Sequence, residues 1–192
     1  STSRRQRQMC IRDRCKECNR KYECTGENAA FCNHMKNILV AKYGAAEGCL
    51  KESRIRHSMG VANFLFAYAK SHDWSKEETE DLYLTGLLHD IGYIDNPKGT
   101  DHGRLGAEIL KRNGLNAEIC ELISCHGRFI ENPSRKQALL WLADLCVNRD
   151  GDYIGYQKRY ESIKERYKND PERLFKVYRI LEYLQIHFSE YR

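Results

Sequence analysis

Apolar residues recur along most of the chain with the spacing of an α-helix. In "HSMGVANFLFAYAKSH" the residues Val61, Phe64, Leu65 and Tyr68 fall on one stripe of helical period. The same kind of pattern predicts helices within 101–114, 116–127, 134–151 and 155–168. No segment shows the alternation of a half-buried strand, and no internal repeat is visible. The pattern therefore predicts an all-α protein.

Local signals mark where several of these helices begin and end. Ser75 is a predicted N-cap, and Glu78 three residues later completes a capping box. That helix is expected to run on to Gly92, because glycine is a common helix stop. A last helix is predicted after Asp170-Pro171, a capping residue followed by proline at the first helical position.

The chain divides into two parts of different composition. Residues 1–34 form a basic, cysteine-rich head, and residues 35–192 form a helical domain with a C-terminal helical extension. Within 1–24 there are eight Arg or Lys against three acidic residues, an excess equal to the whole net charge of +5. Such a head could bind phosphate groups, in nucleic acid or elsewhere, or it could be a solvated tail.

Length and hydropathy narrow the class of protein. With 192 residues and 41% hydrophobic residues, the chain suits one domain of ordinary size plus an appendage. No apolar run is long enough for a membrane span, and "STSRRQRQMC" lacks the apolar core of a secretory signal. We therefore expect a cytoplasmic protein with no membrane partner. The oligomeric state is not predicted.

Cysteines are concentrated in the head, which contains five of the nine. Without an export signal, metal ligation accounts for them better than disulfides do. The Cys-x2-Cys pair can reach one ion from a tight turn, which favours zinc, whereas all-cysteine ligation also suits an iron–sulfur cluster. Reduced free thiols are the third alternative. The candidate ligands are Cys10, Cys15, Cys18, Cys24 and Cys32. The other four, Cys49, Cys120, Cys125 and Cys146, are expected to be buried small apolar residues.

The stretch "LTGLLHDIGYID" places His89 and Asp90 side by side directly after an apolar run. A buried imidazole or carboxylate is costly unless a partner satisfies it, and a metal ion satisfies both. Asp144 is a similar case, because it lies inside the strongly apolar "ALLWLADLCVN".

Further histidines stand at predicted helix ends and extend this set. Imidazoles and carboxylates together suit Fe, Mn, Zn or Co rather than calcium. One or two ions could be held, and Asp90 is the natural bridge because a carboxylate has two oxygens. Any single histidine could instead be a helix cap or a packed core residue. His72, next to Asp73, is expected to be exposed, and His187 to pack or to face solvent. His34 belongs with the cysteines if it binds a metal. The candidate ligands are His57, His89, Asp90, His102, His126 and Asp144.

The order His57, His89-Asp90, a later histidine and Asp144 resembles the HD-domain metal-dependent phosphohydrolases, and "LLHDIGY" is similar to their HDIG motif. The resemblance covers residues 50–150 and implies five core helices around a metal site. It implies that His57, His89, Asp90 and Asp144 hold one metal, and that His102 and His126 add ligands for a second. His89 and Asp90 would then be the catalytic pair.

"HDIGY", "HG" at 126–127 and "LADLCVNRDG" look similar to a subgroup that hydrolyses dinucleoside polyphosphates. Arg149 matches an arginine of that subgroup, whereas Gly92 and Tyr93 stand where it has a lysine. The implied reaction is hydrolysis of a phosphoester or phosphoanhydride, of a nucleotide or similar phosphorylated small molecule, by metal-activated water. Candidate phosphate ligands, each of which could instead be a surface cation, are Lys98, Arg104, Arg128 and Arg149.

Two other functions fit the same residues. The helical scaffold and ligand order also support oxygen chemistry at a di-iron centre in some relatives. A non-enzymatic regulatory protein could bind nucleic acid through the basic head and keep a non-catalytic HD site. The fold does not choose among these functions, because the chemistry depends on the site.

Overall fold

The computed structural model describes residues 52–93 and 101–192, and the regular structure in these ranges is helical. The cysteine-rich head, Cys49 and Lys98 lie outside the described residues. An isolated bridge between Val147 and Tyr153 is the one β-type pairing among the described residues. The helices are α3 (Glu52–Ser71), α4 (Lys76–Leu88), α5 (His102–Arg112), α6 (Ala117–Cys125), α7 (Arg135–Cys146), α8 (Tyr156–Arg166) and α9 (Pro171–His187), with 3-10 turns η2 (Ile91–Tyr93) and η3 (Ser189–Tyr191). The predicted all-α fold is confirmed.

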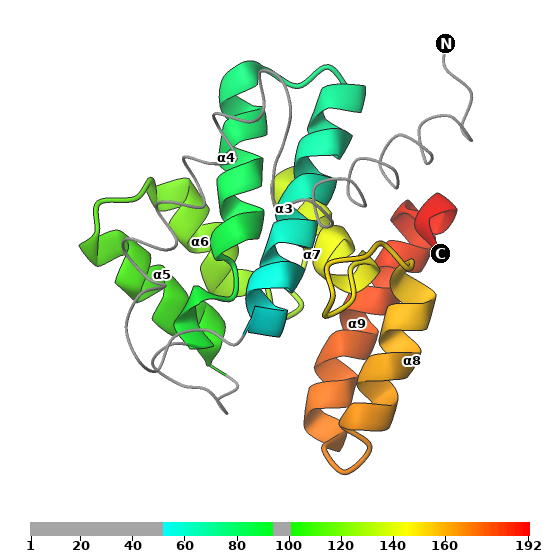
Figure 1. Ribbon diagram of the computed structural model, residues 1–192. Helices are drawn as coiled ribbons and strands as arrows, with labels where there is room; N and C mark the ends of the chain where they lie inside the picture. Colours follow the sequence, from blue (N-terminus) through cyan, green and yellow to red (C-terminus); the bar gives the residue numbers. More distant parts are fainter. Residues whose placement is uncertain (1–51, 94–100) are drawn as a thin grey trace.

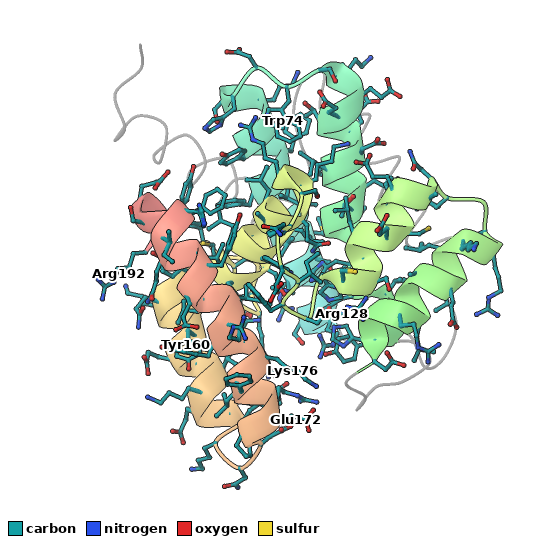
Figure 2. The ribbon with its side chains drawn as sticks, turned by 180° about the vertical axis from the view of Figure 1, so that it is seen from behind. Trp74, Arg128, Tyr160, Glu172, Lys176 and Arg192 are labelled. Atoms are coloured by element: carbon teal, nitrogen blue, oxygen red, sulfur yellow. The ribbon has the colours of Figure 1, made fainter. Side chains whose placement is uncertain are left out.

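Figure 1 shows α3 and α4 side by side and antiparallel, with α7 behind them, the α5–α6 pair on one side and the α8–α9 hairpin on the other. The start of α3 and the end of α4 therefore lie at the same end of the pair. Trp74, in the turn that joins these two helices, is at the opposite end (Figure 2). This arrangement brings residues near the start of α3 next to residues that follow α4.

Local capping explains several helix boundaries. The Ser75 side chain accepts from the Glu78 backbone N–H, and the Glu78 side chain accepts from Ser75, so the predicted capping box is confirmed. Asp170 caps α9 with Pro171 in its first turn, also as predicted. The predicted end of α4 at Gly92 was wrong. The helix ends at Leu88, and the chain turns through η2, where Gly92 packs against the backbone at the start of α5.

Two apolar clusters share α3. One joins α3 to α7, α8 and α9 around Phe64, Trp141 and Tyr156, and the other joins α3 to α4, α5 and α6. The cysteines Cys120, Cys125 and Cys146 are buried free thiols, as predicted from their apolar surroundings. Helix α3 therefore packs on both sides, and its N-terminal turns contact the α4–α6 cluster through Ile55 and Met59.

In the described part of the chain, every helix is too short or too polar to traverse a lipid bilayer.

Candidate metal centre

Four imidazoles and two carboxylates converge at the end of the α3–α4 pair where α3 begins and α4 ends. They come from five helices: one from early α3, two from directly after α4, one from the start of α5, one from after α6 and one from α7. Their ligand atoms form three overlapping groups, each with all atoms within 4.8 Å of one another. Every metal ligand candidate of the sequence is in this cluster: His57, His89, Asp90, His102, His126 and Asp144.

Asp90 lies at the centre of the cluster. Its Oδ1 atom is 3.5 Å from Nε2 of His102 and 3.6 Å from Nε2 of both His89 and His126. His102 and His126 approach each other to 2.9 Å between their Nε2 atoms. Two nitrogen lone pairs at this distance repel unless a proton or a cation lies between them. The short separation therefore indicates a position suited to positive charge.

Asp144 joins the cluster from α7. Its Oδ1 atom is 3.0 Å from Nε2 of His57 and 3.9 Å from Nε2 of His89. The carboxylate is 28% exposed, whereas the His89 ring is fully buried. The cluster is thus most exposed to solvent at Asp144, and less so at His102.

Backbone carbonyls orient three of the imidazoles. The Nδ1 atoms lie within hydrogen-bond distance of a carbonyl oxygen: 2.7 Å from Gly86 for His89, 2.6 Å from Ile123 for His126, and 3.0 Å from Asn148 for His57. Since a carbonyl only accepts, each Nδ1 donates, and in the neutral ring Nε2 presents its lone pair to the cluster. Nε2 of His89 is buried and has no hydrogen-bond partner. Buried polar atoms are rarely left in this state, so a cation is a fitting partner.

Both carboxylates are held in the charged form. Burial raises the pKa of Asp90, but His89, the contact with His126, His102 and Arg54 outweigh it and leave that pKa well below its usual value. Burial likewise raises the pKa of Asp144, and the contact with His57 together with the nearby His89 brings it below normal. Two ionised carboxylates at neutral pH supply the negative charge that a divalent cation needs.

The imidazoles differ in their protonation. Burial lowers the pKa of His89, and burial together with His126 lowers the pKa of His102 to about 3. Burial acts the same way on His126, but contact with the Asp90 carboxylate prevails and raises its pKa. His89 and His102 are therefore neutral at neutral pH, whereas His126 favours the charged form more than a free imidazole does.

The family model for the HD domain matches residues 54–177, which include the whole cluster. This chain belongs to the HD-domain family. HD domains form a superfamily of metal-dependent hydrolases, and a donor set of four imidazoles and two carboxylates fits a divalent transition metal. The resemblance read from the HDIG stretch is thereby confirmed for the helical domain.

Two curated proteins are similar to parts of this HD-domain chain. Ribonuclease Y of Fervidobacterium nodosum is 35% identical over 92 residues, which cover 43% of this chain and 18% of that protein. An uncharacterized protein of Methanocaldococcus jannaschii is 31% identical over 77 residues, 39% of this chain and 45% of that protein. The chain thus spans less than half the length of either relative. No solved structure matches the chain significantly.

Two further residues support the HD cluster. Arg54 donates to Oδ2 of Asp90 at 2.7 Å, and its guanidinium lies 3.3 Å from the centroid of the Tyr93 ring. The Tyr93 ring also stacks on His102, with centroids 4.0 Å apart. Sequence reasoning missed both supporting residues. The spacing of Arg54, three residues before His57 on the same helix, was the available signal.

The predicted phosphate ligands occupy different surroundings. Arg104 is exposed and paired with Asp101 and Glu108 on the surface of α5. Arg128, in the connection between α6 and α7 (Figure 2), donates to Sγ of Cys125 at 3.3 Å. Arg149 is exposed in the loop after α7. Partial burial and the positive charges of Arg166 and Arg54 lower its pKa. A role for any of the three in binding phosphate stays a prediction, as it does for Lys98.

The glycine of the HDIG motif is required by close packing, and we expect Gly92→Ala to weaken both folding and metal binding. A Cβ at Gly92 would overlap the carbonyl oxygen of His102 and lie 2.5 Å from the backbone nitrogen of Gly106. Forcing η2 away from α5 should cost about 1–3 kcal/mol of unfolding free energy and displace His102. Urea denaturation and zinc titration measure the two effects.

Ser75→Ala is the control for this substitution. It removes a cap at the far end of α4, so it should cost about 1 kcal/mol while zinc affinity stays unchanged. Equal zinc affinity in Gly92→Ala and in the unmodified protein would contradict the packing argument.

Proposed function

We propose that this protein is a metal-dependent phosphohydrolase that cleaves a phosphoester or phosphoanhydride of a nucleotide or similar phosphorylated small molecule. The observation that carries the proposal is the convergence of six ligand side chains from five helices on one buried position. Two observations support the proposal. Nε2 of His89 is buried without a hydrogen-bond partner. The chain also belongs to the HD-domain family.

The residues divide into two ligand sets that meet at Asp90. One ion would be held by His57, His89, Asp90 and Asp144. A second ion would be bound with the additional ligands His102 and His126. Both ions would be iron, manganese, zinc or cobalt. Bound metal would supply a hydroxide nucleophile near neutral pH and withdraw charge from the phosphoryl oxygens. Arg54 fixes Oδ2 of Asp90, which leaves Oδ1 facing the imidazoles. Burial of His89 and Asp90 excludes bulk water from this side of the centre.

Ribonuclease activity is a second candidate. The similarity to Ribonuclease Y favours it, because the matched segment lies in a protein named for cleaving RNA. The reacting bond would then be a phosphodiester rather than a phosphoanhydride. A metal held by the cluster would supply a water-derived nucleophile for either bond.

The head 1–34 and the helical domain 35–192 are proposed as separate units. A zinc ion or an iron–sulfur cluster on Cys10, Cys15, Cys18, Cys24 and Cys32 would fold the head around its metal. Its basic residues would guide polyanionic substrates, in the small-molecule and the RNA version alike.

Elemental analysis of protein purified without added metal, followed by assays on a panel of phosphate compounds, tests the function. We expect one or two transition-metal ions beyond those of the head, and release of phosphate or nucleotide from at least one compound. The panel needs nucleoside monophosphates, nucleoside triphosphates, dinucleoside polyphosphates and short RNA. Metal-loaded protein that consumes oxygen and hydrolyses none of them would instead establish a di-iron oxygenase.

A further inference from the structure

Helix α8 contains an arginine in an unusual environment. Arg159 is 7% exposed, and its Nε atom is buried without a hydrogen-bond partner. A buried guanidinium with an unused donor is costly, because desolvation removes its water without replacing the lost hydrogen bonds. Such a group in a native protein calls for an explanation, and a ligand that supplies the missing acceptor is one explanation.

The helix presents this arginine on its inner face. Tyr156 and Ile163, which lie one turn before and one turn after Arg159, are both buried. Arg166 stands two turns beyond Arg159 and so on the same face. Tyr156 and Ile163 belong to the same apolar cluster as the core residues of α7, so this face of α8 lies against the helix that carries Asp144. The negative charges of Asp144 and Asp90 act on Arg159 in agreement with that placement.

Positive charge collects around Arg159. Burial, followed by Arg166 and Arg149 among the repelling charges, lowers the pKa of Arg159 even though Asp144 and Asp90 oppose the shift. Burial, Arg166 and Arg54 lower the pKa of Arg149 in the same way. These guanidiniums therefore repel one another, and each makes the charged form of its neighbour less favourable.

The two carboxylates that attract Arg159 each have another partner. Asp90 already pairs with Arg54, and Asp144 is hydrogen-bonded to His57 in the ligand cluster. Cations bound in the metal centre would offset the negative charge of these carboxylates, which would then attract the arginines less. An anion at the arginines offsets the repulsion, and phosphate is well matched because a guanidinium can hold two of its oxygens.

We propose that Arg159, with Arg149 and Arg166, forms a subsite for a second phosphate group beside the one that is hydrolysed. The inference rests on the proposed function for the position of the scissile group. It identifies the substrate class as a phosphoanhydride chain, such as a nucleoside diphosphate, a nucleoside triphosphate or a dinucleoside polyphosphate. Phosphates of an anhydride chain share a bridging oxygen, so their charges lie closer together than those of RNA, where a ribose separates successive phosphodiesters. A compact group of three arginines matches the closer spacing.

Two non-hydrolysable probes test the subsite on the full, metal-loaded chain. Methylphosphonate offers one phosphonate group, and methylenediphosphonate offers two that are held in a short chain. Isothermal titration calorimetry measures the affinity for each, and elemental analysis afterwards verifies that the metal is retained. The ratio of the two affinities isolates the contribution of the second group, because the metal centre acts on both probes.

We expect Arg159→Gln and Arg166→Gln to weaken methylenediphosphonate binding about tenfold or more and to leave methylphosphonate binding within about twofold. Lys164→Gln is the matched control, since it removes the same charge from the exposed, opposite face of α8. Circular dichroism checks the fold of the buried Arg159 variant. The exposed Arg166 variant tests the subsite if Arg159→Gln does not fold.

Equal affinity ratios in the unmodified protein and in both arginine variants would overturn the subsite. If Arg159→Gln weakens binding of the dinucleotide pUpU as strongly as that of methylenediphosphonate, the assignment to a phosphoanhydride chain is wrong. An arginine-dependent ratio in a protein that hydrolyses nothing on the panel would retain the anion subsite and reject the hydrolase.

Discussion

Asp90→Asn is expected to abolish hydrolysis and to release metal, with kcat/KM falling by at least about 10³-fold. Oδ1 of Asp90 faces three imidazole nitrogens at 3.5–3.6 Å, so it is the most shared ligand atom of the centre. An amide is neutral and presents one acceptor oxygen. The variant thus loses the charge that balances the cation, while its shape is nearly unchanged.

The chain contains a matched control for this substitution. His72-Asp73 is a second His-Asp pair, with His72 stacked on Tyr68 and Asp73 exposed in a turn. Asp73 has a φ of 56°, a left-handed conformation that asparagine tolerates well. Asp73→Asn should therefore keep full activity and metal content. Activity in Asp90→Asn within tenfold of the unmodified protein, with metal retained, would reject Asp90 as a central ligand.

Elements set by local sequence could be predicted, and those set by tertiary contact could not. The capping box of Ser75 and Glu78 involves residues three apart, so it is visible in the sequence. The end of α4 is different. Gly92 is an ordinary helix stop in sequence, but its actual role is to let η2 approach the backbone of α5, a contact between segments joined by residues 94–100.

The site shows the same division. Residue type and order identified the six residues that converge, because burying histidines and aspartates at helix ends is costly unless a cation binds them. Arg104 was a candidate because a guanidinium can hold two phosphate oxygens, yet the structure pairs it with Asp101 and Glu108. Arg159 was missed because "GYQKRYESIKERYK" carries many exposed cations and nothing local distinguishes the buried one. Only the packing of α8 does so.

Removal of metal is expected to lower the melting temperature of the helical domain by about 8–16 °C. A ligand present at 1,000 times its dissociation constant stabilises the folded state by about 4 kcal/mol, provided the unfolded chain does not bind it. For a domain of this size, each kcal/mol corresponds to roughly 2–4 °C. Without metal, Nε2 of His89 has no partner, and the carboxylates of Asp90 and Asp144 repel each other. The cluster then has little to compensate for the lost cation.

Differential scanning calorimetry before and after dialysis against a chelator measures this shift. Asp90→Asn should melt at one temperature in both conditions, whereas Asp73→Asn should show the full shift. The head could contribute through its own metal, and a variant with Cys15 and Cys18 replaced by serine separates that contribution. Because the cluster ties five helices together, we expect most of the shift to survive in the cysteine variant. If the shift disappears in the cysteine variant but persists in Asp90→Asn, the stabilising metal is bound in the head and not in the histidine cluster.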